Sequence, residues 1–116
     1  MTGQDEPTKL VMMIVSDTDA DDLMAALVEH GVPATKVGSS GGFLRRGNVT
    51  IFTGVPASGV EGVLAIVNEI APARTELVPV QTLPFVGDSA FATEPIEVRV
   101  GGAIVFVLNV EQFQRI

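Results

Sequence analysis

A short, continuous apolar run near the N-terminus is the feature that most constrains the fold of this chain. Residues 9–15 read Lys-Leu-Val-Met-Met-Ile-Val, a run typical of a β-strand that is buried on both faces. The chain has 116 residues, which favours a single domain. Because 47% of its residues are hydrophobic and its mean hydropathy is +0.42, it can supply a core around such a strand.

Helical and extended patterns alternate along the rest of the chain. Capping oxygens at 16–19 precede apolar residues at helical spacing, and Gly31 ends this first predicted helix. A second helix begins at 56–58 and is stopped by Pro72. The pair Gly101-Gly102 predicts a two-residue hairpin turn, because glycine adopts positive φ freely. The predicted strands are residues 9–15, 32–37, 49–55, 73–80, 96–100 and 103–110.

This order, β-α-β-β-α-β-β, predicts an α+β fold. We expect a ferredoxin-like βαββαβ sandwich with an additional C-terminal hairpin strand and a long loop within 72–94. Residues 1–8 are expected to be a disordered N-terminal tail, and residues 9–116 a single domain. Two helices cover one face of the sheet, and nothing in the chain is left to cover the other. An exposed apolar face predicts a homo-oligomer that packs its sheets together.

Charge and composition argue against several classes of partner. The 7 Lys and Arg against 14 Asp and Glu give a net charge of −7, which repels nucleic acid and anionic membrane surfaces. The absence of cysteine excludes disulfides and thiolate metal sites. Residues 1–7 lack the features of a signal peptide, and no apolar run approaches the roughly 18–20 residues that span a bilayer. We therefore expect a cytoplasmic protein.

Two motifs suggest catalysis or metal binding, and each has a simpler explanation. Residues 38–42 match the G-x-S-x-G nucleophile elbow, but that motif needs a following helix and a later histidine. Here a strand follows, and the only histidine, His30, lies upstream. The aspartates within 17–22 lack the glycine and glutamate of a calcium loop, and carboxylates at a helix N-terminus offset the helix dipole. We therefore expect neither an enzyme nor a metal site.

The glycine-rich segment 35–48 carries the features of an anion site. Consecutive glycines such as Gly41 and Gly42 let backbone N–H groups converge on an anion without an interfering Cβ. Thr35 adds a hydroxyl donor to this segment. Lys36 and Arg45 add positive charge to a protein that is otherwise acidic.

The same segment has the side chains that a nucleobase requires. Phe43 and Leu44 form a bulky apolar pair that could stack on a base, and Asn48 offers both a donor and an acceptor to an adenine edge. The alternative is a plain hairpin in which Phe43 and Leu44 only fill the core. Periodicity by itself leaves these two interpretations evenly balanced.

Several stretches resemble the signature of the PII-like cyclic di-AMP receptors, and the resemblance extends from Leu10 to Phe113. It implies a non-enzymatic signalling protein, a homotrimer with cyclic di-AMP in its intersubunit clefts and no cofactor. Loop ordering would relay the messenger to an unknown downstream protein. The matching stretches are Thr35-Lys36, Ser39–Arg45, Gly47–Thr50, Glu97–Ala103, Val105–Val107 and Val110–Phe113.

The resemblance also implies a role for individual residues. Phe43 and Leu44 would pack against an adenine, and Asn48 would bond its edge. Thr35 and the amides near Gly42 would hold a phosphate, while the backbone at Gly54 would approach the base. Arg115 stands where a neighbouring subunit usually supplies a glutamine. The predicted ligand-binding residues are Thr35, Lys36, Gly41, Gly42, Phe43, Leu44, Arg45, Gly47, Asn48, Gly54 and Arg115.

The chain departs from the family pattern at a few positions. Pro33 stands where the family often has a basic residue, and Arg46 replaces a small one. The long loop keeps an aromatic at Phe91 but loses the methionine-glycine and tyrosine-proline features. Two alternatives therefore stay open. The chain could sense another adenine nucleotide, ATP or ADP, or it could be a ligand-free trimeric interaction scaffold.

Overall fold

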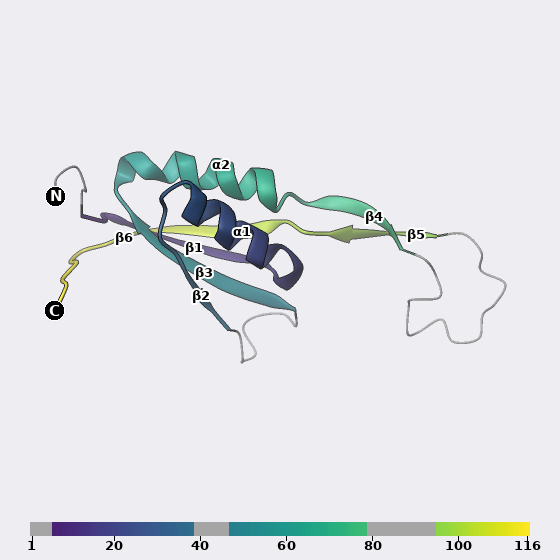
Figure 1. Ribbon diagram of the computed structural model, residues 1–116, viewed down its shortest axis with the longest axis horizontal. Helices are drawn as coiled ribbons and strands as arrows, with labels where there is room; N and C mark the ends of the chain where they lie inside the picture. Colours follow the sequence, from purple (N-terminus) through teal and green to yellow (C-terminus); the bar gives the residue numbers. More distant parts are fainter. Residues whose placement is uncertain (1–5, 39–46, 79–94) are drawn as a thin grey trace.

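The computed structural model describes residues 6–38, 47–78 and 95–116. Four antiparallel strands form the main sheet in the order β2-β3-β1-β6, and α1 and α2 pack on one of its faces (Figure 1). The strands β4 and β5 form a separate two-stranded ribbon that extends beyond this sheet (Figure 1). The elements are β1 (Lys9–Ser16), α1 (Asp17–Glu29), β2 (Thr35–Val37), β3 (Asn48–Val55), the 3₁₀ turn η1 (Ala57–Gly59), α2 (Val60–Ile70), β4 (Arg74–Val78), β5 (Ile96–Val100) and β6 (Ala103–Asn109).

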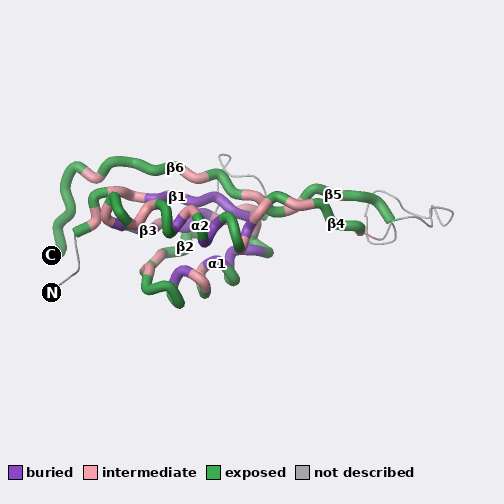
Figure 2. The backbone as a smooth tube through the Cα atoms, turned by 90° about the horizontal axis from the view of Figure 1, so that it is seen from above, coloured by how far each residue is buried: buried purple, intermediate pink, exposed green. Residues whose placement is uncertain are grey.

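The apolar run at the N-terminus forms β1, which lies in the interior of the sheet. It pairs with β3 along its full length and with β6 on its other side (Figure 2). Its alternate residues Val11, Met13 and Val15 are fully or almost fully buried beneath the helices. Burying a side chain of this size contributes about 1.5–3 kcal/mol relative to leaving it exposed. The strand predicted at 9–15 is therefore confirmed, with one further residue.

The first helix follows its capping signals. The Ser16 side chain accepts a hydrogen bond from the Thr18 amide, which otherwise has no partner within the helix. Leu23 and Leu27 are fully buried against the sheet. At the other end, Gly31 adopts a φ of 77° and its amide donates to the Val28 carbonyl, so the predicted end of the helix is confirmed.

The second helix starts with a short 3₁₀ turn after Pro56 and continues as α2. Val63, Ile66 and Val67 are buried and belong to the same core as the residues of β1 and α1. Helix α2 ends at Ile70, two residues before Pro72, as predicted. Together the two helices and the inner residues of β1 and β3 form one hydrophobic core on one side of the sheet.

The predicted hairpin at Gly101-Gly102 is wrong. Both glycines have positive φ, 75° and 85°, but β5 pairs with β4 while β6 pairs with β1. The two glycines therefore carry the chain from the ribbon into the main sheet. The physical reason is that β1 and β4 compete as partners for the two strands. β6 pairs with seven residues of β1, and β5 pairs with five residues of β4. The last strand, predicted at 103–110, is confirmed to within one residue.

Two other predictions need correction or lie partly outside the described residues. The second strand was expected from residue 32, but β2 begins at Thr35, because Pro33 has no amide to donate to a ladder. The carbonyl of Pro33 instead accepts a hydrogen bond of 2.6 Å from the Thr53 hydroxyl. The strand predicted at 73–80 is confirmed over Arg74–Val78, which form β4. Residues 79–94 lie outside the described part of the chain.

The segment before β1 continues the line of that strand. The Thr8 amide donates to the Val55 carbonyl, and the Thr8 carbonyl accepts from the Val110 amide. The Thr8 hydroxyl also accepts from the Ala57 amide. Residue 8, which the sequence placed in the N-terminal tail, is thus hydrogen-bonded between the ends of β3 and β6. Residues 1–5 lie outside the described residues.

Candidate functional site

The face of the main sheet opposite the helices is apolar and is not covered by either helix (Figure 1). Successive residues of a strand point to opposite sides, so the partners of Met12 lie on the same face as Met12. A row of paired residues thus crosses all four strands on this side, from Thr35 through Phe52 and Met12 to Phe106. We call this side the open face. Its other apolar members are Leu10, Ile14, Val37, Ile104 and Leu108.

Three predicted ligand-binding residues share the open face. Thr35 pairs with Phe52, while Asn48 and Gly54 stand at even spacing from Phe52 along β3. Their neighbours Ile51 and Thr53 alternate to the helix side, where they are buried. Thr35 is exposed and Asn48 is half-buried. The structure therefore brings a hydroxyl, an amide side chain and a glycine backbone onto one side of the sheet.

The three residues are spread along the face. Asn48 is the first residue of β3, and Gly54 is the last but one. The two are six residues apart, which at ~3.3 Å per residue corresponds to about 20 Å. Thr35, opposite Phe52, lies nearer to Gly54 than to Asn48. A ligand that touches both ends of β3 in one subunit must therefore be long. A smaller ligand could contact an Asn48 and a Gly54 at the same time only where two copies of the chain meet.

Gly54 has a contact within its own chain. A Cβ built at this position would lie 3.0 Å from the Pro7 Cβ, closer than side chains normally approach. The N-terminal segment therefore packs against the backbone where the resemblance places a base. Glycine at 54 has this structural reason in addition to any role in binding.

Lys36 does not join the open face. It pairs with the buried Ile51, and its amino group lies 3.1 Å from a carboxylate oxygen of Asp21 on α1. Both side chains are well exposed, so this ion pair contributes at most about 1 kcal/mol. Of the two charges expected to serve an anion, Lys36 is thus turned toward the helix layer. The other, Arg45, lies outside the described residues with Gly41, Gly42, Phe43 and Leu44.

Gly47 and Arg115 occupy opposite ends of the sheet. Gly47 has a φ of 87°, and its carbonyl accepts a 2.7 Å hydrogen bond from the Asp17 amide, beside the start of β3. Arg115 is exposed in the C-terminal segment, which leaves β6 beside the end of β3, and its guanidinium lies 5.8 Å from the centre of the Phe113 ring. Within one chain the two do not form a common site.

The open face contains aromatic residues that the sequence analysis did not select. Phe52 and Phe106 flank Met12, and Phe106 is 46% exposed. Strict alternation along 48–55 and 103–109 could have identified them, because one side of each strand faces the helices and the other does not. The necessary signal was therefore present in the sequence, but only the pairing register shows that the two rings share a face.

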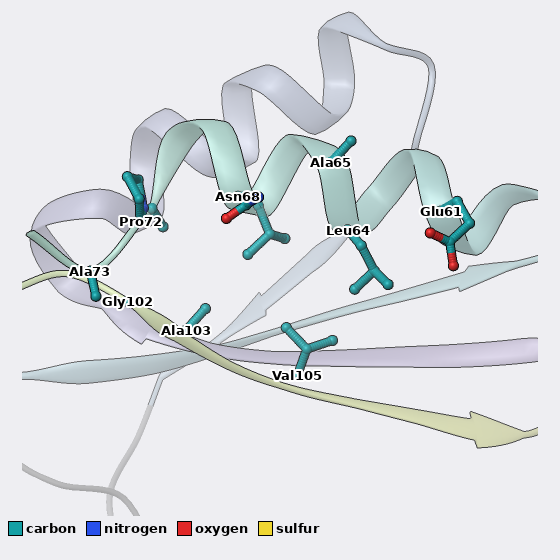
Figure 3. A pocket seen from close by; sticks show the side chains of 11 residues that line it. Glu61, Leu64, Ala65, Asn68, Pro72, Ala73, Gly102, Ala103 and Val105 are labelled. Atoms are coloured by element: carbon teal, nitrogen blue, oxygen red, sulfur yellow. The ribbon is translucent and has the colours of Figure 1, made fainter.

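A concavity lies on the helix side of the sheet. A groove of about 560 Å³ opens between α2 and β6 and is lined by small and apolar side chains, with Glu61 and Asn68 at its polar positions (Figure 3). Leu64, Ala103 and Val105 form part of its wall (Figure 3). Among the described residues, none of those predicted to bind the ligand lines it. It is therefore separate from the open face.

Two of the aspartates near the start of α1, Asp19 and Asp21, pair with basic side chains. Arg74 bonds both carboxylate oxygens of Asp19, and Lys36 pairs with Asp21. Within residues 6–38, 47–78 and 95–116, no three His, Asp or Glu side chains are grouped to hold a metal ion. In the same ranges, no helix is both long enough and apolar enough to cross a membrane.

Comparison with known proteins agrees with these features. The family model described as cyclic-di-AMP receptor matches residues 8–116. The chain belongs to the cyclic-di-AMP receptor family. This match confirms the resemblance seen in the glycine-rich segment and at the C-terminus.

Two solved structures resemble this cyclic-di-AMP receptor family member. One is a functionally unknown protein from Pediococcus pentosaceus ATCC 25745, with 39% identity, a TM-score of 0.73 and coverage of 95% of this chain and 98% of that one. The other is CPII, a nitrogen regulatory PII-like protein from Thiomonas intermedia K12 bound to ADP, AMP and bicarbonate. It has 18% identity, a TM-score of 0.55 and coverage of 95% and 97%. At this identity the likeness concerns the fold, and the predicted PII-like α+β class is confirmed.

Proposed function

We propose that this protein is a non-enzymatic, cytoplasmic signalling protein that binds cyclic di-AMP in the clefts between subunits of a homotrimer. One observation carries the proposal. Thr35, Asn48 and Gly54, which the sequence singles out for nucleotide binding, all lie on the open face of the sheet, opposite the helices. Membership of the cyclic-di-AMP receptor family supports the choice of ligand.

The composition of the open face supports self-association. Ile104, Phe106 and Leu108 are 58%, 46% and 43% exposed, and they stand beside Ile14, Met12 and Leu10 in the same rows. Large exposed apolar surface is unfavourable in water, and packing sheet against sheet between copies removes it from solvent. The partner that fits this face best is a second copy of the same chain, since an apolar sheet is complementary to itself.

The spacing along β3 supports a ligand shared between subunits. Asn48 and Gly54 of one copy are about 20 Å apart at ~3.3 Å per residue. When open faces pack together, one subunit can supply the end of its open face that carries Thr35, and the next subunit the end that carries Asn48. Arg115, at the end of a C-terminal segment that leaves the sheet beside β3, would then reach the site from a neighbour.

The chemistry of the site fits an anionic purine. The Thr35 hydroxyl donates to a phosphate oxygen, and the amides of Gly41 and Gly42 surround the same charge. The Asn48 amide reads the adenine edge, while Phe43 and Leu44 pack on the ring. Arg45 and the backbone of the exposed Gly47 complete the contact, and Lys36 adds longer-range charge from the helix side.

The position of His30 supports a signalling role without catalysis. The one histidine of the chain, His30, bonds the Ala26 carbonyl through Nδ1 at 2.8 Å, at the end of α1. It is therefore engaged as a helix cap at the end of α1. Ligand binding instead changes the ordering of the loops around the site, which presents a different surface to a downstream protein.

Titration calorimetry with purified protein and cyclic di-AMP tests the proposal, together with the molar mass from light scattering. We expect saturable heat and the mass of a trimer. A ligand that binds only the folded trimer should also stabilise it, by about 2.7 kcal/mol at 100 times its Kd. No heat at tens of micromolar nucleotide, or a monomer in solution, would overturn the proposal.

A second candidate ligand is another adenine nucleotide. The similar protein CPII was solved with ADP and AMP bound, and Pro33 replaces a basic residue that would contact a phosphate. The same titration with ATP, ADP and AMP separates the two ligands by their Kd values. Tighter binding of a mononucleotide would favour this candidate, and no binding of any nucleotide would favour a ligand-free trimeric scaffold.

A further inference from the structure

We infer that the first turn of α1 links Gly47, immediately before β3, to the β4–β5 ribbon, so that a nucleotide bound beside Gly47 alters the stability of the ribbon. This inference rests on the proposed function and names the route by which binding reaches a distant element. Three parts of the chain meet at this turn: Gly47, residues 17–19, and Arg74 at the start of β4.

The first contact joins the turn to the glycine-rich segment. The Asp17 amide donates to the Gly47 carbonyl at 2.7 Å. The first amides of a helix have no acceptor within the helix, so this bond satisfies a group that would otherwise need water. Gly47 makes this contact with a φ of 87°, a value that only glycine adopts freely. A change in the backbone at Gly47 therefore acts directly on the start of α1.

The second contact joins the same turn to the ribbon. Asp19 is 6% exposed, and its two carboxylate oxygens accept from Arg74 Nη1 at 3.2 Å and Nη2 at 3.0 Å. The hydrogen bond to Asp19 raises the pKa of Arg74 above its usual value, so the guanidinium stays charged. A buried carboxylate that loses its charged partner is strongly unfavourable, and Asp19 and Arg74 should therefore move together.

The third feature makes the base of the ribbon stiff. Arg74 also donates to the Pro72 carbonyl at 3.0 Å, and the Gly102 amide donates to the Ala71 carbonyl at 3.0 Å. A Cβ added at Gly101 would overlap both the Arg74 guanidinium and the Pro72 carbonyl. Because the two strands of the ribbon are held at their base, a displacement of Asp19 is passed into β4 and β5. Figure 1 shows the ribbon leaving the sheet from this point.

The local stability of the ribbon can respond to a change at its base. It consists of two strands and projects away from the core (Figure 2), and a two-stranded ribbon alone is only marginally stable. Its amides therefore exchange with solvent through local opening, and a small change at its base shifts that equilibrium measurably. Leu77, at 64% exposed, and Ile96, at 40%, lie toward its far end.

Amide hydrogen exchange of the full chain, with and without cyclic di-AMP, tests the inference in the wild type, in Asp19→Asn and in Asp22→Asn. Asp22→Asn removes a carboxylate from an exposed position of the same helix and serves as the control. In the wild type and the control we expect the nucleotide to slow exchange in residues 74–78 and 96–100 about tenfold. In Asp19→Asn the change should be less than about twofold, while calorimetry gives a Kd within about threefold of the wild type.

The outcomes separate this inference from the proposed function. No binding heat in the wild type would overturn both. Binding heat with unchanged exchange in the ribbon would overturn the inference alone, and so would a full ribbon response in Asp19→Asn. Where Asp19→Asn does not fold, Arg74→Gln replaces it, because that side chain is 35% exposed and easier to change. The same loss of response is expected, and a retained response again overturns the route.

Discussion

Thr35 lies directly opposite Phe52 in the ladder between β2 and β3, and this pairing places its hydroxyl on the open face. The strand that holds Thr35 has only three residues, and its next residue, Lys36, points to the helix side and pairs with Asp21. A shift of one residue in this short ladder would exchange the two side chains. The position of a hydroxyl donor in the candidate site therefore depends on three residue pairs.

Removal of the Thr35 hydroxyl tests its role in binding. In Thr35→Val the shape and the strand propensity are kept while the donor to an anionic phosphate is lost. Because a hydrogen bond to a charged group contributes about 1.5–3 kcal/mol, the Kd for cyclic di-AMP should rise at least tenfold. The melting temperature should stay within about 2 °C. Thr75→Val on the exposed ribbon is the control, and equal Kd values for both variants would exclude Thr35 from the site.

A matched pair of substitutions on β6 tests which face forms the homotrimer. Phe106 and Val107 are 46% and 45% exposed, but Phe106 lies on the open face and Val107, opposite Val11, on the helix side. Phe106→Glu places a charge in the proposed interface and should convert the trimer into monomers at micromolar concentration. Val107→Glu should leave the trimer intact. Sedimentation velocity distinguishes trimers from monomers. If Val107→Glu dissociated the trimer and Phe106→Glu did not, the interface would lie on the helix side and the proposed open-face interface would be wrong.

Two glycine-to-alanine substitutions should change stability in opposite directions. Gly101 has a φ of 75°, and an added Cβ would overlap Arg74 and the Pro72 carbonyl, so Gly101→Ala should destabilise the fold by about 1–3 kcal/mol. Gly62 lies exposed in α2 with nothing within 4 Å of an added Cβ, and Gly62→Ala should stabilise the fold by about 1 kcal/mol. Urea unfolding measures both values. A neutral Gly101→Ala would argue against a tightly held ribbon base.

The hydroxyl of Thr53 should hold the start of β2 in place. It is 2% exposed and donates to the Pro33 carbonyl at 2.6 Å, two residues before Thr35. Thr53→Val keeps the volume but loses this bond, at a cost of about 1 kcal/mol. We expect faster amide exchange in β2 (Thr35–Val37), whereas Thr53→Ser, which keeps the donor, should retain slow exchange there. Equal exchange in the two variants would mean that the ladder alone holds β2.

The local elements of this protein follow from its sequence. The apolar run at 9–15 became β1, capping by Ser16 and termination at Gly31 bound the first helix, and Pro72 follows the end of the second. These features depend on residues within one or two turns of each other, so short-range preferences decide them. The apolar face opposite the helices was also predictable, because in the expected ferredoxin-like βαββαβ sandwich both helices lie on the same side of the sheet.

The long-range pairings were decided only by the tertiary structure. Gly101-Gly102 has the positive φ of a hairpin turn, yet β6 pairs with β1 and β5 with β4. The contact between Asp19 and Arg74 joins residues 55 positions apart. Likewise, nothing in the order Thr35-Lys36 says which of them faces the helices. A turn sequence or a charge permits several partners, and the partner is selected by which strand and which buried group the completed fold places beside it.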